Sequence, residues 1–227
     1  MVTRMSLPIA VSAFIVLCSD VGCSASTVDE ATSALRSRLH TAQLRAAVED
    51  NEKLLRSKVF ADRKKAVLFF YDMRAREVLL ALLPIKVGPG NEEFARSWDS
   101  ELGLRIRVTE MCSDAFCVED VPALCDVACS AASGYSTASG EANAGIASLQ
   151  EGILRCACRA LGVEWEAPKD GRRWFRNQGA IIEWFVATVK AAKGKPGYVQ
   201  PLDSVLNAIE ARQAQGTPAS VPTEEKR

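Results

Sequence analysis

The feature that most constrains this fold is a stretch without glycine or proline, which runs from Thr27 to Leu83. Glycine and proline are the residues that most often end a helix, so their absence over this length favours helical structure. Apolar residues recur at helical spacing through the first part of the stretch, with one phase shift near Leu44. The pattern predicts one long amphipathic helix over 27–60.

The segment 66–87 fits two structures. A helical stripe through it would end at Pro84, whereas two short strands over 67–71 and 78–87 would flank a turn at Asp72. Short apolar runs do not distinguish a helix from a strand. The turn lacks the glycine or Asn-Gly pair that is typical of tight hairpins, so we favour the helix and keep a short hairpin as the alternative.

Gly88-Pro89-Gly90 interrupts the pattern and is predicted to separate a helical appendage, 26–90, from a second domain over 91–213. The whole chain is therefore expected to be mainly α. Residues 214–227 are polar, with glycine and proline, which predicts a disordered tail. The elements expected in the second domain are helices over 91–102, 122–133, 146–160, 174–193 and 201–209, a stop at Gly103, and a short strand over 104–108.

Residues 1–25 have the layout of a secretory signal peptide. Arg4 supplies the positive charge, and Leu7–Cys18 is an apolar run followed by small and polar residues. The run is shorter than the roughly 20 apolar residues that span a bilayer, so no membrane span is expected in the mature chain. The protein is predicted to be exported, to the periplasm or the extracellular space. A lipid anchor at Cys23 is a weaker alternative, because Asp20 stands where a leucine-like residue is expected.

The chain has eight cysteines, and removal of the leader takes away Cys18 and Cys23. An even number of thiols in an oxidising compartment predicts a disulfide-stabilised domain, although the sequence does not determine their pairing. If Cys125 and Cys129 are helical they share a face, and we expect each to bridge to another element rather than to its mate. The spacing matches no standard zinc site, so no metal is predicted. The disulfide candidates are Cys112, Cys117, Cys125, Cys129, Cys156 and Cys158.

Charge is balanced overall but uneven along the chain. The sequence has 28 Lys and Arg against 28 Asp and Glu, which argues against a nucleic-acid partner because such proteins carry a basic excess. However, 36–65 holds nine basic and four acidic residues, whereas 108–154 holds seven acidic residues and no Lys or Arg. Either these are ordinary solvated faces, or they steer and orient a protein partner.

No set of residues predicts catalysis or a cofactor. His40 is the only histidine and has no evident partner for acid-base chemistry. Glu164 and Glu166 form a pair of neighbouring acids that is typical of a solvated turn. The basic and aromatic strip 172–176 is expected to be core and rim, and Cys156-Ala-Cys158 lacks the spacing of a redox pair. We therefore predict no catalytic residues and a protein that is not an enzyme.

A series of residues in the second domain follows the order found in a known family. They are Cys129, Gly134-Tyr135, Gly140, Cys156, Cys158, Pro168, Gln178, Ile181-Ile182, Trp184-Phe185, Pro196, Val205-Leu206 and Ala208. Over about 104–211 the chain resembles the Rap/Tai family of periplasmic immunity proteins. The resemblance implies a small, mostly helical, disulfide-linked domain that binds and neutralises a secreted toxin. The helical appendage and the larger cysteine set depart from the family pattern.

Together these observations predict an exported, non-catalytic binding protein that acts on a protein partner, in the manner of an immunity-like inhibitor. The alternative is a structural or assembly component of a secretion or conjugation apparatus. In that case 27–60 would serve as a helical arm through which copies of the chain form a homo-oligomer.

Overall fold

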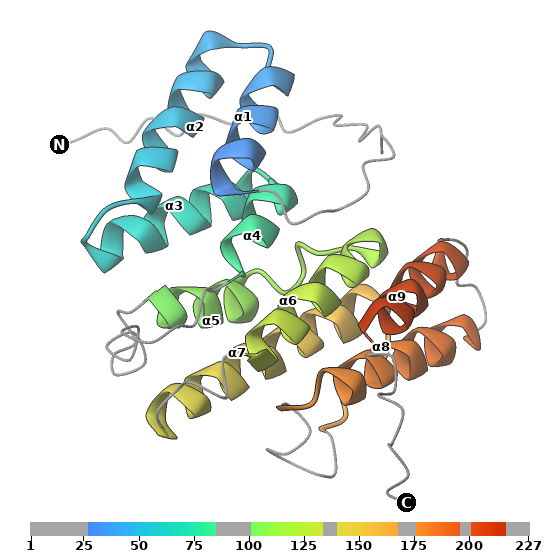
Figure 1. The fold of residues 1–227 in the computed structure, drawn as a ribbon. Helices are drawn as coiled ribbons and strands as arrows, with labels where there is room; N and C mark the ends of the chain where they lie inside the picture. The colour runs from blue at the N-terminus through green and yellow to red at the C-terminus, as the bar shows by residue number, and fades with distance from the viewer. Residues whose placement is uncertain (1–26, 85–100, 134–139, 168–175, 196–200, 217–227) are drawn as a thin grey trace, which may run out of the picture.

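The structure, a computed structural model, describes residues 27–84, 101–133, 140–167, 176–195 and 201–216. Within these ranges the regular secondary structure is entirely helical, which confirms the predicted mainly α class (Figure 1). The α-helices are α1 (Val28–Arg38), α2 (Ala42–Leu55), α3 (Phe60–Asp72), α4 (Arg76–Leu82), α5 (Glu101–Met111), α6 (Val121–Ser133), α7 (Gly140–Ala160), α8 (Gln178–Lys193) and α9 (Leu202–Gly216), with a short 3-10 helix, η2 (Val118–Asp120), before α6.

The predicted single helix over 27–60 is wrong, because the chain breaks into α1 and α2, which lie side by side (Figure 1). Leu39 leaves helical geometry with φ −83° and ψ 128°, and its side chain is buried at the bend. Thr41 then caps α2, because its hydroxyl accepts a hydrogen bond from the backbone N–H of Leu44 at 3.2 Å. The phase shift in the apolar stripe therefore marks a turn between two helices.

The described part of segment 66–87 is helical, as favoured, and the hairpin alternative is wrong. The helix is not continuous, however, because Arg74 adopts the left-handed conformation with φ 53° between α3 and α4. The backbone N–H of Ala75 donates to the carbonyl of Phe70 at 2.9 Å, which closes the end of α3. Ala75 and Phe70 are both buried, so the turn is held by the core as well as by this hydrogen bond.

Helix α5 replaces the strand expected over 104–108 and runs through Gly103, which was expected to end a helix. Leu104, Ile106 and Val108 are all buried, as are Leu102, Gly103 and Thr109, whereas Arg105 is half-buried and Arg107 is exposed. A helix that is buried on most sides has no clear apolar stripe, so its short pattern resembled alternation. The helix expected to start at residue 91 lies mostly outside the described residues.

The later helices confirm the sequence pattern with small changes in their ends. Helix α6 matches the predicted range, α7 begins earlier, at Gly140, and the described part of α8 begins at Gln178. Helix α9 extends to Gly216, so residues 214–216 are helical rather than part of a tail. The remaining tail and the predicted leader, 1–25, lie outside the described residues. No described helix is both long and apolar enough to cross a membrane.

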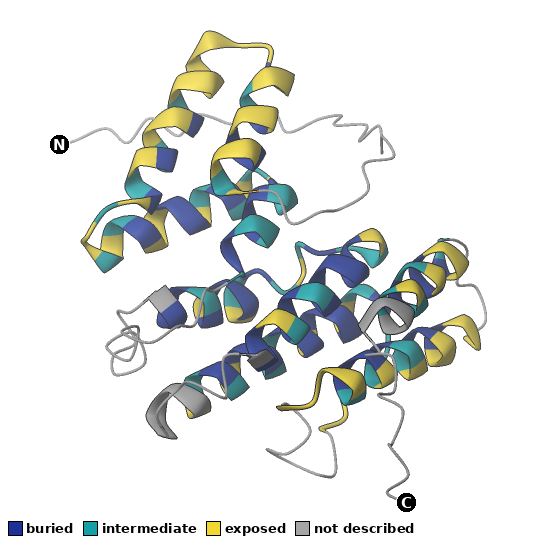
Figure 2. Cartoon of the chain, in the orientation of Figure 1, coloured by how far each residue is buried: buried dark blue, intermediate teal, exposed yellow. Residues whose placement is uncertain are grey.

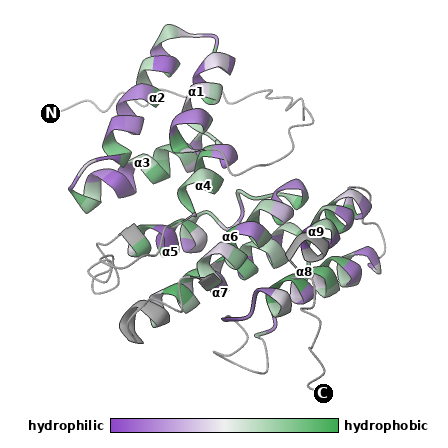
Figure 3. Cartoon of the chain, viewed as in Figure 1, coloured by the Kyte–Doolittle hydropathy of each residue, from purple (hydrophilic) through white to green (hydrophobic). Residues whose placement is uncertain are grey.

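Packing joins the two predicted domains through the core. Helices α3 and α4 contact α5, while α7 packs against α5 and α6, and α8 packs against α6 and α9. The buried apolar side chains of all nine helices belong to one continuous cluster. Figure 2 shows these buried faces turned toward neighbouring helices, and Figure 3 shows the hydrophilic residues of α1 and α2 on their outer faces.

Candidate functional site

The acidic stretch 108–154 is compensated by arginines, most of which come from other parts of the chain. An ion pair joins an arginine to five of its acidic residues in the described structure. These pairs are Arg107–Glu110 at 2.8 Å, Arg74–Asp114 at 4.0 Å, Arg76–Asp120 at 3.8 Å, Arg155–Glu151 and Arg212–Asp126. The uneven charge along the sequence is thus largely balanced in space, so these five carboxylates are already engaged within the chain.

Two of these ion pairs, Arg74–Asp114 and Arg76–Asp120, join the N-terminal helices to the rest of the molecule. The hydroxyl of Tyr71 donates to the carboxylate of Asp114 at 2.9 Å, which raises the pKa of Tyr71. The Arg74 guanidinium lies 5.1 Å from the centre of the Tyr71 ring and also faces Asp114. Part of the basic appendage is therefore bound to the chain's own acidic segment.

Cys117 lies beside the Arg76–Asp120 ion pair. Its thiol donates to Glu119 at 2.7 Å and contacts Arg76, while its backbone N–H donates to Asp120 at 2.9 Å. Burial raises the pKa of the Cys117 thiol, and the neighbouring carboxylates raise it further. Burial also raises the pKa of Asp120. At neutral pH Cys117 is therefore a protonated hydrogen-bond donor at the junction of α4 and η2.

The six candidate cysteines are thiols in this structure, with no two sulfur atoms at bonding distance. The thiols of Cys125 and Cys129 interact with each other along α6, and the Cys129 thiol also lies 4.0 Å from the carbonyl oxygen of Gln178 in α8. The Cys125 thiol donates to Cys129, which lowers the pKa of Cys129. Cys112 directly follows α5 and Cys156 lies on α7, which packs against α5, and burial raises the pKa of each thiol to about 12. The disulfide framework stays a prediction.

Among the described residues, no three histidine, cysteine or carboxylate side chains converge as a metal site would require.

Gln150 supplies a buried polar contact in the bundle. Its side-chain amide donates to the carbonyl of Ala128 at 2.9 Å, which joins α7 to α6.

The end of α7 turns the chain across the bundle. Gly162 has φ 63°, and its backbone N–H donates to the carbonyl of Arg159 at 3.1 Å. The N–H of Val163 reaches back to the carbonyl of Cys158 at 2.9 Å. This pair of hydrogen bonds is the Schellman arrangement, which requires the left-handed conformation that glycine adopts without strain. The turn brings the next segment, with Trp165, against α8.

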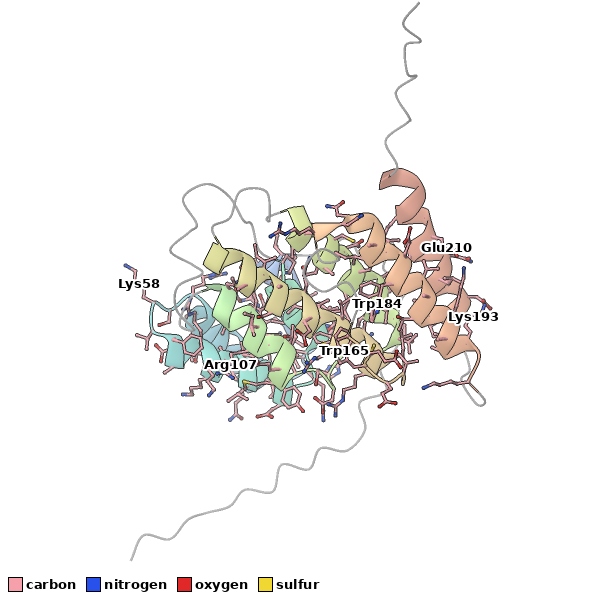
Figure 4. The ribbon with its side chains drawn as sticks, turned by 90° about the horizontal axis from the view of Figure 1, so that it is seen from below. Lys58, Arg107, Trp165, Trp184, Lys193 and Glu210 are labelled. Atoms are coloured by element: carbon pink, nitrogen blue, oxygen red, sulfur yellow. The ribbon has the colours of Figure 1, made fainter. Side chains whose placement is uncertain are left out.

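Trp165 and Trp184 meet between α7 and α8, as Figure 4 shows. Their ring centroids are 5.8 Å apart at an interplanar angle of 61°, and Trp184 makes a second edge contact with Phe185, 5.2 Å away. The Arg155 guanidinium lies 5.7 Å from the centre of the Trp165 ring and pairs with Glu151. Both tryptophans are only partly buried. We call Trp165, Trp184 and Arg155 the tryptophan surface.

Lys195, which follows α8, contacts the turn that carries Trp165. Its ammonium group donates to the carbonyl of Gly162 at 2.7 Å, so the residues after α8 are tied to the turn that carries Trp165. The tryptophan surface is therefore held at both of its helices.

Comparison with known proteins identifies no relative. No family model, curated protein or solved structure matches this chain. The resemblance to the Rap/Tai family rests on the residues quoted from the sequence and stays a prediction.

The structure brings together residues that the sequence analysis had treated separately. His40 is exposed in the connection between α1 and α2. Glu164 and Glu166 are exposed on either side of Trp165, as expected for a solvated turn. Of the strip 172–176, only Arg176 lies among the described residues, and it is exposed. The contact between Trp165 and Trp184 was missed, since it depends on how the segment after α7 folds back against α8.

Proposed function

We propose that this protein is a non-catalytic binding protein that docks a protein partner on the tryptophan surface. The observation that carries the proposal is the contact between Trp165 and Trp184, two large aromatic side chains that pack on each other and remain partly exposed. Tryptophan and arginine are enriched among the residues that dominate binding energy at protein interfaces. Arg155 stacked on Trp165 adds to the same surface.

The charges around this surface favour a basic partner. Glu164 and Glu166 flank Trp165, Glu183 precedes Trp184, and all three carboxylates are exposed. A lysine or arginine of the partner could stack on an indole ring while its neighbours pair with this acidic rim. The five carboxylates of 108–154 that already pair with arginines are less suited to that role.

The experiment uses the full chain, immobilised, to capture proteins from the culture supernatant and periplasmic extract of its own organism. The captured protein is identified by mass spectrometry, purified, and titrated against wild type, Trp165→Ala and Trp184→Ala. Truncating a residue that dominates an interface costs about 2 kcal/mol or more, which corresponds to a loss of affinity of about 30-fold.

The matched control is Leu68→Ala, which changes an exposed apolar residue of α3, a helix that makes none of the tryptophan contacts. We expect it to retain wild-type affinity. A partner that binds the tryptophan variants as tightly as wild type would refute the site, and the absence of any stoichiometric partner would refute the function.

The specific form that we propose is an immunity-like inhibitor of a secreted toxin, acting after export from the cytoplasm. This form is supported by the leader pattern in residues 1–25 and by the resemblance over 104–211. It predicts that the captured partner is itself toxic when expressed alone and that the present protein neutralises it. Loss of this protection in the Trp184→Ala variant would connect the activity to the proposed surface.

A second candidate is an assembly component that forms homo-oligomers through its N-terminal helices. Among the described residues, the large apolar side chains with the greatest exposure are Leu44, Val59 and Leu68, which all lie on or between α2 and α3. The arm would be a pair of helices and not the single long helix that was expected. Light scattering would then show a mass that rises with concentration, and Leu44→Ser with Leu68→Ser would abolish the rise. The first proposal expects a monomer.

A further inference from the structure

Two glycines of α7, Gly145 and Gly152, lie very close to α5. A Cβ atom on Gly145 would lie 2.5 Å from Cδ2 of Leu102, and a Cβ on Gly152 would lie 2.8 Å from Cβ of Thr109. From the first contact to the second, the position on α5 rises by seven residues and so does the position on α7. The two helices therefore run in the same direction, with one face of each in contact. This register determines which residues meet in the following turn.

Cys112 and Cys156 occupy that following turn. The Cys156 sulfur lies 3.5 Å from the carbonyl oxygen of Thr109, and the Arg159 guanidinium donates to the Ser113 hydroxyl at 3.2 Å. Cys112 lies between these two contact points in the sequence, and both cysteines are fully buried. A charge on Cys112 also raises the pKa of Cys156, as expected for neighbouring thiols.

The other four cysteines have different surroundings. Cys117 contacts Arg76 and Glu119, and Cys125 interacts with Cys129 on its own helix. Cys158 is two residues beyond Cys156, which places it on a different side of α7 from the one that faces α5. Cys112 therefore has one cysteine opposite it across the α5–α7 contact, and that cysteine is Cys156.

We propose that Cys112 and Cys156 form a disulfide that joins α5 to α7 when the protein folds under oxidising conditions. The glycine contact supports this pairing, because a disulfide needs Cα atoms about 4.4–6.8 Å apart and small residues let two helices approach closely. The pairing goes beyond the proposed binding function and does not depend on it, so either can fail alone.

The oxidant in the reaction is a small disulfide such as oxidised glutathione. The thiolate of one cysteine attacks the glutathione disulfide, which forms a mixed disulfide and releases one glutathione. The second cysteine then attacks the mixed disulfide, which forms the Cys112–Cys156 bond and releases the second glutathione. Two protein thiols lose two protons and two electrons, and one oxidised glutathione becomes two reduced molecules. In the folded chain both thiols are buried, so the exchange must take place during folding.

The test is oxidative refolding of the full chain. Reduced, unfolded protein is refolded with oxidised glutathione at pH 8, and the remaining thiols are alkylated. No Lys or Arg lies within 108–154, so trypsin alone would leave four cysteines on one peptide. A protease that cleaves after Asp and Glu separates Cys112, on 111–114, from Cys117 and from the peptide 152–164. We expect mass spectrometry to find 111–114 linked to 152–164.

Because 152–164 contains both Cys156 and Cys158, variants identify the partner. The link is expected to persist in Cys158→Ala and to disappear in Cys156→Ala. Reduction is expected to lower the melting midpoint of wild type and of Cys158→Ala, with no such change in Cys156→Ala. The proposal is overturned if Cys112 of refolded wild type is alkylated, if it is linked to any other cysteine, or if the link survives in Cys156→Ala. If Cys156→Ala does not fold, persistence of the link in Cys158→Ala still identifies Cys156 as the partner, and a wild-type link from Cys112 to any peptide other than 152–164 still overturns the proposal.

Discussion

Gly152 of α7 packs directly on Thr109 of α5, so close that a methyl group at position 152 would lie 2.8 Å from the Cβ of Thr109. Thr109 is buried, and its hydroxyl donates to the carbonyl of Ile106 at 2.8 Å, which holds the side chain in place. The two residues thus set the separation of α5 and α7, and the position of both helices in the core depends on the absence of a side chain at Gly152.

The first prediction concerns Gly152→Ala. Overpacking a closely packed interface costs about 1–3 kcal/mol, while alanine regains up to about 1 kcal/mol of helix propensity. We expect a net loss of about 1–2 kcal/mol in the free energy of unfolding, measured by urea denaturation of the reduced protein.

The matched control is Gly194→Ala at the end of α8. A Cβ there would meet only the backbone oxygens of Ala191 and Lys190, at 3.5 and 3.9 Å, and the backbone φ of −73° suits alanine. The free energy of unfolding should be unchanged or higher by up to about 1 kcal/mol. Equal losses at positions 152 and 194 would refute the close packing of Gly152 on Thr109.

The second prediction concerns thiol reactivity in the folded, reduced protein. The thiolate is the reactive form of cysteine, and the pKa of Cys129 is lowered by the Cys125 thiol. Burial raises the pKa of Cys112 and Cys156 to about 12. Iodoacetamide at pH 8 should therefore label Cys129 well before Cys112 or Cys156, as followed by peptide mass spectrometry. Rapid labelling of Cys112 without loss of structure would contradict its burial.

The third prediction is a loss of stability in alkaline solution under reducing conditions. Burial raises the pKa of Cys158 to about 11, and that of Cys112 and Cys156 to about 12, whereas unfolded thiols ionise near about 8.5. As the pH rises from about 8.5 toward 11, the unfolded state loses protons that the folded state keeps, so the free energy of unfolding falls. Each thiol contributes up to about 1.4 kcal/mol per pH unit.

The comparison for this prediction is Cys158→Ala, measured by urea denaturation from pH 7 to pH 10. Its free energy of unfolding should fall less steeply with pH than that of wild type, whatever its value at pH 7. An identical pH dependence in the two proteins would show that Cys158 does not keep its proton in the folded state.

The fourth prediction concerns Gln150, whose buried amide joins α7 to α6 through the carbonyl of Ala128. Gln150→Ala removes this hydrogen bond and leaves a cavity, and the expected cost is about 2–3 kcal/mol in the free energy of unfolding. Ser148→Ala, on the exposed side of the same helix, should change it by less than about 0.5 kcal/mol. A loss at Ser148 equal to that at Gln150 would show that the buried amide has no special role.

Much of the secondary structure could be predicted from the sequence, because the signals that begin and end a helix are local. The helix predicted to end at residue 160 does end at Ala160, and Gly162 follows it in the left-handed conformation. The breaks at Leu39 and Arg74 were missed. No glycine or proline marks them, and both are held by burial of Leu39 and Ala75 in the core. Helix α5 was taken for a strand because burial on most sides removes the helical stripe.

The candidate site was predicted less well, because its contacts join segments far apart in the sequence. Local composition identified an acidic stretch but not the arginines that bind it, such as Arg74, Arg76 and Arg212. It likewise identified Trp165 and Trp184 as separate residues, one in a turn and one on a helix.

The helical class, the clustering of six of the eight cysteines in 112–158 and the segregation of charge along the chain could all be predicted from the sequence. These properties follow from residue type and spacing alone. The compensation of these charges by distant arginines, the close contact of α5 with α7 and the meeting of Trp165 with Trp184 became evident only from the tertiary structure. Each of these depends on the packing of one helix on another, which the side chains at the contact determine, as Gly152 and Thr109 do for α5 and α7.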